Sequence, residues 1–359
     1  MADQEPVRGD GRERVEARGI AVLFDPSCGI VERLAVRDGG RVVAPFHAAP
    51  WVGTDEALPE GAAPHLARLG GDFLCAPFGA RDEGSPLHGW TANSAWAVVS
   101  RGPGLLRAVL RRSVRGATVT KELLVEDGSP FLVQRHVFSG GEGRLPVANH
   151  ANLSLPHGAI IRTSPKRAWE TPASPPEPDL ARGRSRVAYP ARAEDPRAFP
   201  AMDGTADLTR YPFFEQTEEF VIGIEAPGHR LGWTAVTRPR EGDLFLSLRD
   251  ARRLPMTMLW HSNGGRDYPP WSGRHVGCLG VEEGAASPML GVSAEADLAG
   301  PGMLTLGGEV KVCHVTGAIA WPTGEPVVEV RQDDDTVVVR GENGAERRLP
   351  LRAGVLPGT

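Results

Sequence analysis

The chain has 359 residues, of which 41% are hydrophobic and 24% are charged. That balance is typical of a soluble globular protein with a large core and excludes disorder of the whole chain. The formal net charge is -5, and Arg and Lys are scattered among carboxylates, which excludes the basic footprint of a nucleic-acid-binding protein. The 44 Gly and 32 Pro weaken helix interiors and favour a fold of many strands and turns.

Residues 1–18 are charged and contain no apolar run of the kind found in signal peptides, so we expect a disordered leader there. No stretch of about 18 apolar residues occurs anywhere, which predicts a cytoplasmic protein without a membrane partner. The cysteines show no C-x-x-C spacing, so neither a zinc knuckle nor a disulfide framework is expected. We predict reduced, mostly buried thiols at Cys28, Cys75, Cys278 and Cys313.

From Gly19 onward, short apolar runs alternate with turn residues. The runs include GIAVLF, GIVERLAV, FLVQRHVF, EEFVIGIEA, RLGWTAV, DLFLSL and a final hairpin made of TVVVR and RRLPLR. Successive hairpins without alternating helices predict antiparallel sheets in a sandwich. We therefore expect an all-β fold with few short helices, of which residues 53–69 are the best weak candidate.

The segment GGDFLCAPFG at residues 70–79 is followed by PLHGW at 86–90 and by Trp96. Its glycines and prolines indicate backbone held close to another group, and His88 lies beside aromatic side chains. Sugar sites combine aromatics, which stack on the apolar face of a pyranose ring, with His, Asp, Asn and Arg for the hydroxyl groups. A Gly-rich turn with a core-packed histidine is the alternative.

The segment VANHANLSL at residues 147–155 is predicted to be a strand. Alternation sends His150 and Asn152 to one face, with a serine, and the apolar residues to the other. This polar row suits a cleft, although a hydrogen-bonded structural histidine is the alternative for His150. His136 and His157 are weaker candidates.

Residues 259–283 form the densest group, with two tryptophans, a tyrosine, two arginines and two histidines ahead of a strand that ends in carboxylates. A solvent-exposed turn with incidental charges is the alternative, but exposed Trp is costly to maintain. A weaker feature, DLTRYP at residues 207–212, suits a plain loop that caps a strand.

These three segments resemble the aldose 1-epimerase and hexose-6-phosphate 1-epimerase families of the galactose mutarotase-like superfamily. The first resembles their GG-x-x-x-C-x-P-F-G and HG motifs, the second their strand with a histidine after an asparagine, and the third their Trp-rich loop before a glutamate. The aromatic pair that usually follows the histidine is missing here. The resemblance covers residues 19 to the late 280s and implies an antiparallel β-supersandwich, with the Pro- and Arg-rich segment 171–200 as a loop beside the cleft and not a domain linker. The remainder is expected to add strands that close the sandwich, which gives a single domain over residues 19–359.

The resemblance implies His150 and Glu282 as a catalytic acid–base pair for the interconversion of α and β anomers. Relatives have Pro in place of Glu283, and adjacent strand residues point to opposite faces, so only one of the two carboxylates can enter the cleft. General acid–base groups typically contribute about 10²–10⁴-fold each. Substrate contacts are expected from a polar and aromatic set: Asp72, Arg81, His88, Trp90, Asn152, Trp260, Arg266, Trp271 and Arg274.

The expected ligand is a monosaccharide or a sugar phosphate. Arg81, Arg266 and Arg274 suit a phosphate or uronate group, although pairing with surface carboxylates is the commoner role of such arginines. A homodimer is one option for the assembly. Because no H-x-H or H-E-x-x-H spacing occurs, neither a metal nor a cofactor is expected.

The sequence is also compatible with two other functions. One is a non-catalytic sugar-binding or sensor protein on the same sandwich, because a fold does not fix a function. The other is a polysaccharide lyase, whose base would be Tyr268.

Overall fold

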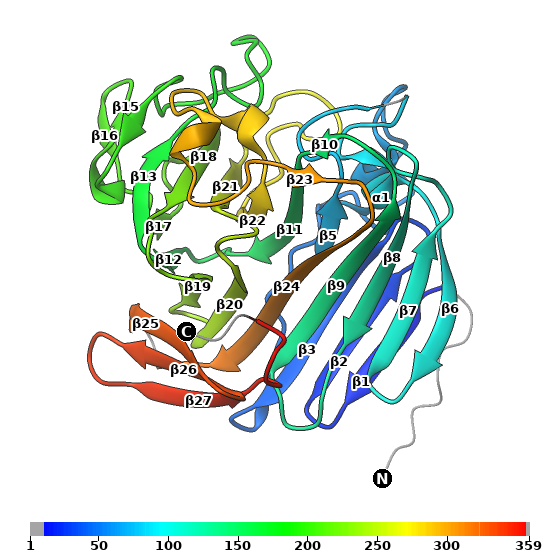
Figure 1. Cartoon of the computed structure of the whole chain (residues 1–359). Coiled ribbons are helices and arrows are strands. Elements are labelled where there is room, and N and C mark those ends of the chain that lie inside the picture. Colours follow the sequence, from blue (N-terminus) through cyan, green and yellow to red (C-terminus); the bar gives the residue numbers. More distant parts are fainter. Residues whose placement is uncertain (1–10, 83, 323, 357–359) are drawn as a thin grey trace.

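The computed structural model describes residues 11–82, 84–322 and 324–356. Over these residues the chain forms two large sheets that lie face to face (Figure 1), and every pair of named strands is antiparallel. The expectation of an all-β sandwich with few short helices is confirmed.

The larger sheet has 11 strands, in the order β1-β2-β3-β5-β11-β22-β21-β18-β13-β14, with β4 paired to β3. Its strands are β1 (Glu13–Ala17), β2 (Ile20–Asp25), β3 (Ile30–Asp38), β4 (Arg41–Val43), β5 (Asp72–Cys75), β11 (Val147–Ser154), β13 (Lys166–Glu170), β14 (Arg192–Ala193), β18 (Thr217–Glu225), β21 (Met256–Asn263) and β22 (Cys278–Ala285).

The smaller sheet has 9 strands, in the order β17-β12-β19-β20-β24-β9-β8-β7-β6. Its strands are β6 (Trp96–Gly102), β7 (Leu105–Leu110), β8 (Ala117–Leu124), β9 (Phe131–Gly140), β12 (Ala159–Thr163), β17 (Arg210–Tyr211), β19 (Leu231–Arg238), β20 (Asp243–Asp250) and β24 (Glu309–Ala320).

Three minor sheets and five short helical segments complete the structure. The C-terminal sheet consists of β25 (Val327–Asp333), β26 (Thr336–Gly341) and β27 (Glu346–Pro350), and it includes the predicted final hairpin. The two-stranded sheets pair β10 (Arg144–Leu145) with β23 (Leu304–Thr305) and β15 (Phe199–Ala201) with β16 (Gly204–Ala206). The helical segments are α1 (Gly89–Asn93) and the 3-10 turns η1 (Pro64–Arg68), η2 (Pro196–Ala198), η3 (Ser287–Met289) and η4 (Glu295–Asp297).

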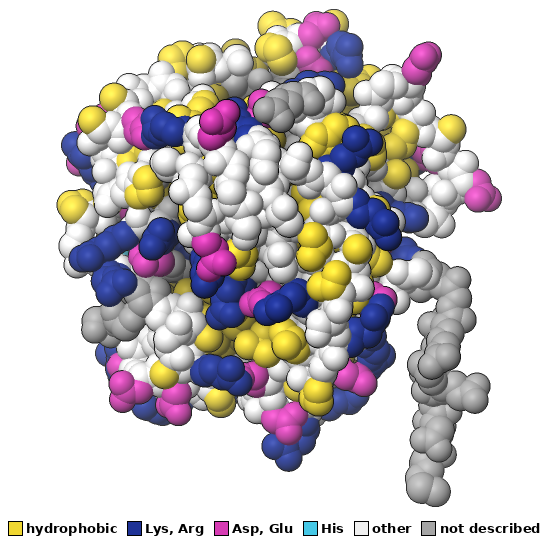
Figure 2. All heavy atoms as spheres, turned by 45° about the vertical axis from the view of Figure 1, so that its right-hand side comes forward, with side chains coloured by type: hydrophobic (Ala, Val, Ile, Leu, Met, Phe, Trp, Pro, Cys, Tyr) yellow, Lys and Arg dark blue, Asp and Glu magenta, His cyan; other side chains and the backbone are white. Residues whose placement is uncertain are grey.

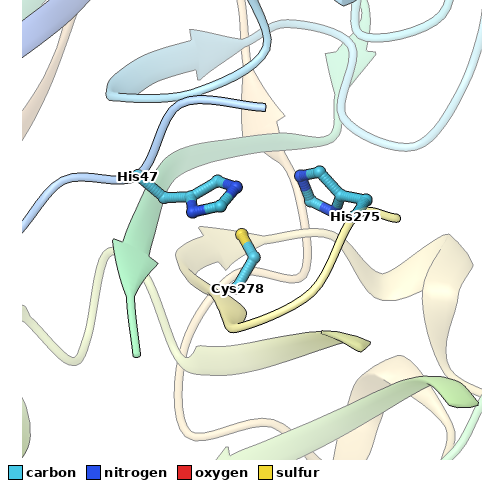
Figure 3. Close-up of side chains that lie close together, drawn as sticks. All are labelled: His47, His275 and Cys278. Atoms are coloured by element: carbon cyan, nitrogen blue, oxygen red, sulfur yellow. The ribbon is translucent and has the colours of Figure 1, made fainter. Parts of the chain in front are cut away.

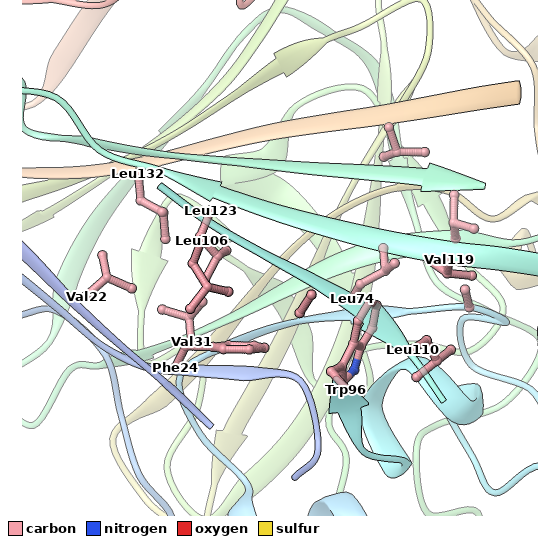
Figure 4. Close-up of a cluster of buried hydrophobic side chains, with 14 of the residues drawn as sticks. Val22, Phe24, Val31, Leu74, Trp96, Leu106, Leu110, Val119, Leu123 and Leu132 are labelled. Atoms are coloured by element: carbon pink, nitrogen blue, oxygen red, sulfur yellow. The ribbon is translucent and has the colours of Figure 1, made fainter. Parts of the chain in front are cut away.

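The core lies between the two large sheets. Figure 4 shows side chains of the larger sheet, such as Phe24 and Leu74, interdigitating with Leu106, Val119 and Leu132 of the smaller one. Alternation along each strand places one set of apolar side chains between the sheets, so the alternate side chains of the larger sheet lie on its opposite face, outside this core. At the surface, Figure 2 shows basic and acidic side chains interleaved around small apolar areas.

The expectation of a disordered leader over residues 1–18 is wrong for Glu13–Ala17. This segment is the edge strand β1, paired residue by residue with β2, and Val15 is only 3% exposed. Backbone pairing and one buried apolar side chain outweigh its charged composition. Residues 1–10 lie outside the described part of the chain.

The weak helical pattern over residues 53–69 yields only the 3-10 turn η1, because Pro59 and Pro64 interrupt it. Residues 171–200 are mostly irregular, as expected, apart from β14, η2 and the start of β15. Among the described residues, none of the helices has the length and apolar character to cross a membrane.

Candidate active site

Two titratable side chains meet on the face of the larger sheet that is turned away from the smaller sheet. His150 on β11 lies directly opposite Glu282 on the neighbouring antiparallel strand β22. Directly paired residues point to the same face, and His150 Nε2 lies 2.9 Å from Glu282 Oε1. Both side chains are at least 95% buried. The sheet therefore delivers an imidazole and a carboxylate in hydrogen-bond contact.

This pair lines a pocket of about 330 Å³, a volume suited to a small ligand. Its wall comes from several strands and loops and consists of His65, Leu66, Leu69, Phe73, Phe78, Gly79, Leu87, His88, His150, Pro172, Ser174, Pro175, Pro176, Phe220, Trp260, Arg266, Trp271, Glu282 and Met289. A larger hollow of about 530 Å³ lies over β1–β3, but the side chains that line it are those of an exposed sheet face and include no histidine.

Aromatic rings surround the His150 imidazole. Phe73, its partner on β5, stacks on it at 4.8 Å between ring centroids with an interplanar angle of 21°. Trp260 and His88 approach edge-on, at 5.7 and 5.8 Å. These contacts hold the imidazole in one orientation and make the pocket walls apolar, as stacking on a sugar ring requires.

His88 lies at the entrance to α1 with a left-handed backbone, at φ 68°. Its Nδ1 accepts a long hydrogen bond of 3.5 Å from the N–H of Gly79, and its ring lies 5.2 Å from that of His65. Desolvation, followed by the repulsion of neighbouring cationic groups, holds the pKa of His88 well below its usual range. Burial lowers the pKa of His65 to about 4. Both imidazoles are therefore neutral near pH 7 and can hydrogen-bond to a ligand without charge.

The cation in the pocket wall is Arg266. It forms an ion pair with the buried Glu218 of β18 and lies 4.5 Å over the ring of Trp271. Glu218 also accepts a hydrogen bond from the indole N–H of Trp260. Burial raises the pKa of Glu218, and the attraction of Arg266 opposes that rise. This network fixes both tryptophans and leaves the guanidinium largely compensated.

The structure brings six of the predicted site residues together in the pocket wall: His88, His150, Trp260, Arg266, Trp271 and Glu282. The predicted loop at residues 171–200 adds Pro172, Ser174, Pro175 and Pro176, so it lies beside the pocket.

Five other predicted contacts lie elsewhere. Asp72 points between the sheets, where it accepts a hydrogen bond from Gln134 and lies 3.8 Å from His314. Asp72 and Phe73 are adjacent strand residues, so they point to opposite faces of the sheet. The sequence pattern could not reveal that Phe73, and not Asp72, faces the pocket. Asn152 shares the face of His150 but is farther along β11, where its amide donates to the carbonyl of Gly71.

Trp90 packs against the core between the sheets and under Arg112, 4.9 Å from the ring centroid. Arg81 is exposed outside the pocket wall. Arg274 pairs with Glu56 and lies over Trp51, also outside the wall. A direct substrate contact from these residues or from Asp72 and Asn152 does not fit this geometry.

Glu283 points away from Glu282, into the space between the sheets. There it forms an ion pair with Arg249, at 2.7 Å, and accepts hydrogen bonds from Thr234, Ser247 and Thr257. Its side chain is fully occupied with structural partners, so only Glu282 is available to a ligand.

Several wall residues could not be predicted from the sequence. Phe73 and Phe220 are signalled only by strand alternation, and His65 and Met289 lie in segments whose place in space depends on tertiary packing. Glu218 lies in an apolar strand pattern that did not indicate a polar contact.

Tyr268, the base required by the lyase alternative, lies outside the wall. The guanidinium of Arg182 lies over it, 4.0 Å from the centroid of the Tyr268 ring.

Gly280 makes room for the side chains of His150 and Glu282. A Cβ at this strand position would lie 2.8 Å from Glu282 Oε1, 3.0 Å from His150 Cε1 and 3.1 Å from Trp260 Cβ. Gly71, by contrast, belongs to the predicted GG motif and has φ 58°, and its Cβ would lie 2.1 Å from the Val31 carbonyl oxygen. The GG motif therefore serves close packing of backbone on β3, and Gly280 serves the site.

Comparison with known proteins defines the class of fold. Neither a protein-family model nor a curated protein sequence matches the chain. Solved structures do match, and they establish that the chain has the galactose mutarotase-like fold, as the sequence resemblance implied.

Three of these structures align with most of this chain over nearly all of their own length. A candidate aldose 1-epimerase from Escherichia coli K12 is 13% identical, with a TM-score of 0.56 over 86% of this chain and 98% of that one. A galactose mutarotase related enzyme from Lactobacillus acidophilus is 13% identical, with a TM-score of 0.54 over 87% and 98%. A galactose mutarotase-like protein from Lactobacillus casei is 11% identical, with a TM-score of 0.55 over 86% and 100%. At these identities the likeness concerns the fold alone.

Proposed function

We propose that this protein is an aldose 1-epimerase that interconverts the α and β anomers of an aldose or aldose derivative by opening and closing the sugar ring. The observation that carries the proposal is the contact of 2.9 Å between His150 and Glu282 in the wall of an aromatic pocket. The names of the similar structures are compatible with this activity.

The reaction needs one base and one acid. Glu282 removes the proton from the anomeric hydroxyl while protonated His150 gives its proton to the ring oxygen, so that the C1–ring oxygen bond breaks and C1 becomes an aldehyde. Rotation about the C1–C2 bond then presents the other face of the carbonyl. The hydroxyl oxygen attacks C1, His150 recovers its proton from that hydroxyl, and Glu282 returns a proton to the new anomeric oxygen.

The atoms available in the pocket suit these roles. Within the described part of the chain, Glu282 Oε2 is buried and has no protein hydrogen-bond partner, so it can receive the anomeric proton. The anomeric oxygen and the ring oxygen are both bonded to C1, so the acid and the base must lie close together. Strand register alone provides this closeness, because His150 and Glu282 are direct partners across β11 and β22.

The wall fits a sugar more closely than an extended polymer. Phe73, Trp260 and Trp271 present apolar surface, and neutral His65 and His88 present hydrogen-bonding nitrogens. Arg266 suits an anionic substituent, although Glu218 already compensates its charge. We therefore expect neutral aldoses to bind, with phosphorylated or acidic aldoses tolerated where they displace Glu218 from Arg266.

Magnetisation-exchange NMR with a panel of neutral and phosphorylated aldoses tests the proposal. The expected result is faster exchange between the α and β anomeric protons of at least one sugar, in proportion to protein concentration. Saturation-transfer signals from a bound sugar without faster exchange would instead identify a non-catalytic binding protein and overturn the epimerase proposal.

A further inference from the structure

Three potential metal ligands converge behind the proposed active site. His47 lies between β4 and η1, His275 precedes β22, and Cys278 is the first residue of β22. Figure 3 shows the two imidazoles and the thiol pointing toward one another. One ring nitrogen from each histidine and Cys278 Sγ all lie within 4.8 Å of one another.

The backbone at this cluster is held from both sides. The N–H of His47 donates to the carbonyl of Asn152 on β11, and the carbonyl of His47 accepts from the N–H of Gly71. The carbonyl of His275 accepts from the N–H of Gly264. Cys278 belongs to a ladder strand paired on both edges. The backbone positions of the three residues are therefore fixed, and side-chain rotation is the movement that binding requires.

The histidines offer free donor atoms to a metal ion. The Nε2 atoms of both rings are buried and have no protein hydrogen-bond partner among the described residues. An unsatisfied buried polar atom is destabilising, and coordination would satisfy both nitrogens.

His275 also has the outer contacts typical of a ligand. Its Nδ1 lies 2.7 Å from Ser262 Oγ, a contact that lets Nδ1 carry the ring proton and leaves a lone pair on Nε2. The ring stacks on Trp260, with 5.5 Å between ring centroids and an interplanar angle of 21°. Trp51 is tilted against it at 5.5 Å between centroids, and Trp271 approaches it edge-on at 5.2 Å. These contacts fix the orientation of the imidazole.

We propose that His47, His275 and Cys278 form a binding site for one Zn²⁺ ion. Two imidazole nitrogens and a thiolate are a donor set suited to zinc and unsuited to Mg²⁺ or Ca²⁺, which take oxygen ligands. Zn–N bonds of about 2.0–2.1 Å and Zn–S bonds of about 2.3 Å place tetrahedral nitrogens roughly 3.3–3.4 Å apart and each nitrogen roughly 3.5–3.6 Å from the sulfur. The present separations are at most 4.8 Å. The donors therefore close by up to roughly 1.5 Å around the ion.

The fourth position falls to a water molecule or to Asn152, whose Oδ1 lies 4.0 Å from Cys278 Sγ as the acceptor of the thiol hydrogen. Binding converts the thiol to a thiolate, so one Zn²⁺ is taken up, one Zn–S and two Zn–N bonds form, the S–H bond breaks and one proton is released. Neutral imidazoles coordinate through a lone pair and release no proton.

The zinc site is separate from the pocket but touches it through Trp260, which stacks on His275 and approaches His150 edge-on. Zinc would therefore stiffen the tryptophan wall without contacting the sugar. The inference does not depend on the proposed epimerase activity, because zinc binding is measured without any sugar.

The test is a zinc titration of the untagged full-length protein against a chromophoric chelator, with metal content confirmed by mass spectrometry. We expect one Zn²⁺ per chain and release of about one proton per ion, measured by calorimetry in buffers of different ionisation enthalpy. Co²⁺ in the same site is expected to show a thiolate-to-metal charge-transfer band.

The matched variants are Cys278→Ser and Cys313→Ser, of which the second removes a partly buried thiol on β24, away from the cluster. Cys278→Ser should weaken zinc binding on the order of 100-fold and abolish the charge-transfer band, since even outer-shell changes cost about 10–100-fold. Cys313→Ser should leave both unchanged. His47→Gln provides a second ligand variant, and circular dichroism checks that each variant is folded.

Failure to retain zinc at equimolar concentration, equal affinity in the two serine variants, or a cobalt spectrum without a thiolate band would each overturn the proposal. Retention of Cu⁺ but not Zn²⁺ would overturn the assignment of the ion.

Discussion

His150 and Glu282 face each other across two adjacent antiparallel strands, with 2.9 Å between Nε2 and Oε1. Their closeness is a property of sheet register, so it persists as long as β11 and β22 stay paired. A one-residue slip of either strand would send its whole set of side chains to the opposite face. The proposed chemistry therefore depends on the same ladder that holds the centre of the larger sheet together.

The Gly280→Ala substitution should impair catalysis with little loss of stability. The added Cβ would press on Glu282 Oε1 and His150 Cε1, so the pair must shift by a few tenths of an ångström or more. Misplacement of catalytic groups by about 1 Å can cost about 10²-fold, so we expect kcat for anomer exchange to fall roughly 10–100-fold and KM to change little. The free energy of unfolding should fall by about 1 kcal/mol, at the low end for overpacking.

The matched control is Gly102→Ala, at a strand position where a Cβ meets no atom within 4 Å. It should keep the wild-type rate. A Gly280→Ala variant with wild-type kcat would show that the pair is not the rate-determining machinery.

The Glu283→Gln substitution should act on stability. It removes the charge that pairs with Arg249, a fully buried guanidinium that retains Glu225 as its other partner. Breaking a buried ion pair costs about 3–5 kcal/mol of the free energy of unfolding. Because Arg249 keeps Glu225 as a partner, we expect a loss of about 3 kcal/mol, at the low end of that range. Urea unfolding measures this loss, with Glu329→Gln, which removes the charge from a partly exposed ion pair with Arg340, as the control. Equal stability of wild type and Glu283→Gln would contradict the interpretation of this residue as structural.

Glu219 predicts a pH dependence of stability. Burial raises its pKa from 4.5 to about 7, against the hydrogen bonds it accepts from the N–H of Arg186 and from the hydroxyl of Tyr189. The folded state therefore holds a proton that the unfolded state has lost, and stability falls as pH rises from 4.5 through 7. At 1.36 kcal/mol per pKa unit, the expected loss is about 3 kcal/mol.

The Glu219→Gln variant cannot titrate here, so its stability relative to wild type should rise by about 3 kcal/mol between pH 4.5 and pH 8. Urea unfolding of both proteins at the two pH values measures this difference, and the other titrating groups cancel. A difference that does not change with pH would mean that Glu219 is ionised throughout.

Much of the fold could be predicted from the sequence because strand alternation and turn chemistry are local. The final hairpin around Glu342 and Gly344 and the placement of the apolar face of β11 both followed from that pattern. The β1 strand was missed because its charged composition hides an edge strand that one buried side chain, Val15, anchors.

Individual site contacts were harder to predict because they depend on which face of a strand meets the pocket. From the sequence, alternation shows only that Glu282 and Glu283 point to opposite faces of their strand. The structure shows that Glu282 is the residue that faces the pocket. Asp72 was misplaced by one residue of alternation, since Phe73 takes the pocket side. His47 and Cys278 are 231 positions apart in the sequence, so no spacing motif could have signalled their convergence.

The most direct test of the central claim is anomer exchange by polarimetry or NMR in wild type, Glu282→Gln and His150→Asn, with the exposed His157→Asn as the matched control. We expect each pocket variant to lose about 10²–10⁴-fold in kcat while remaining folded, and His157→Asn to keep the wild-type rate. Wild-type exchange rates in both pocket variants would contradict it.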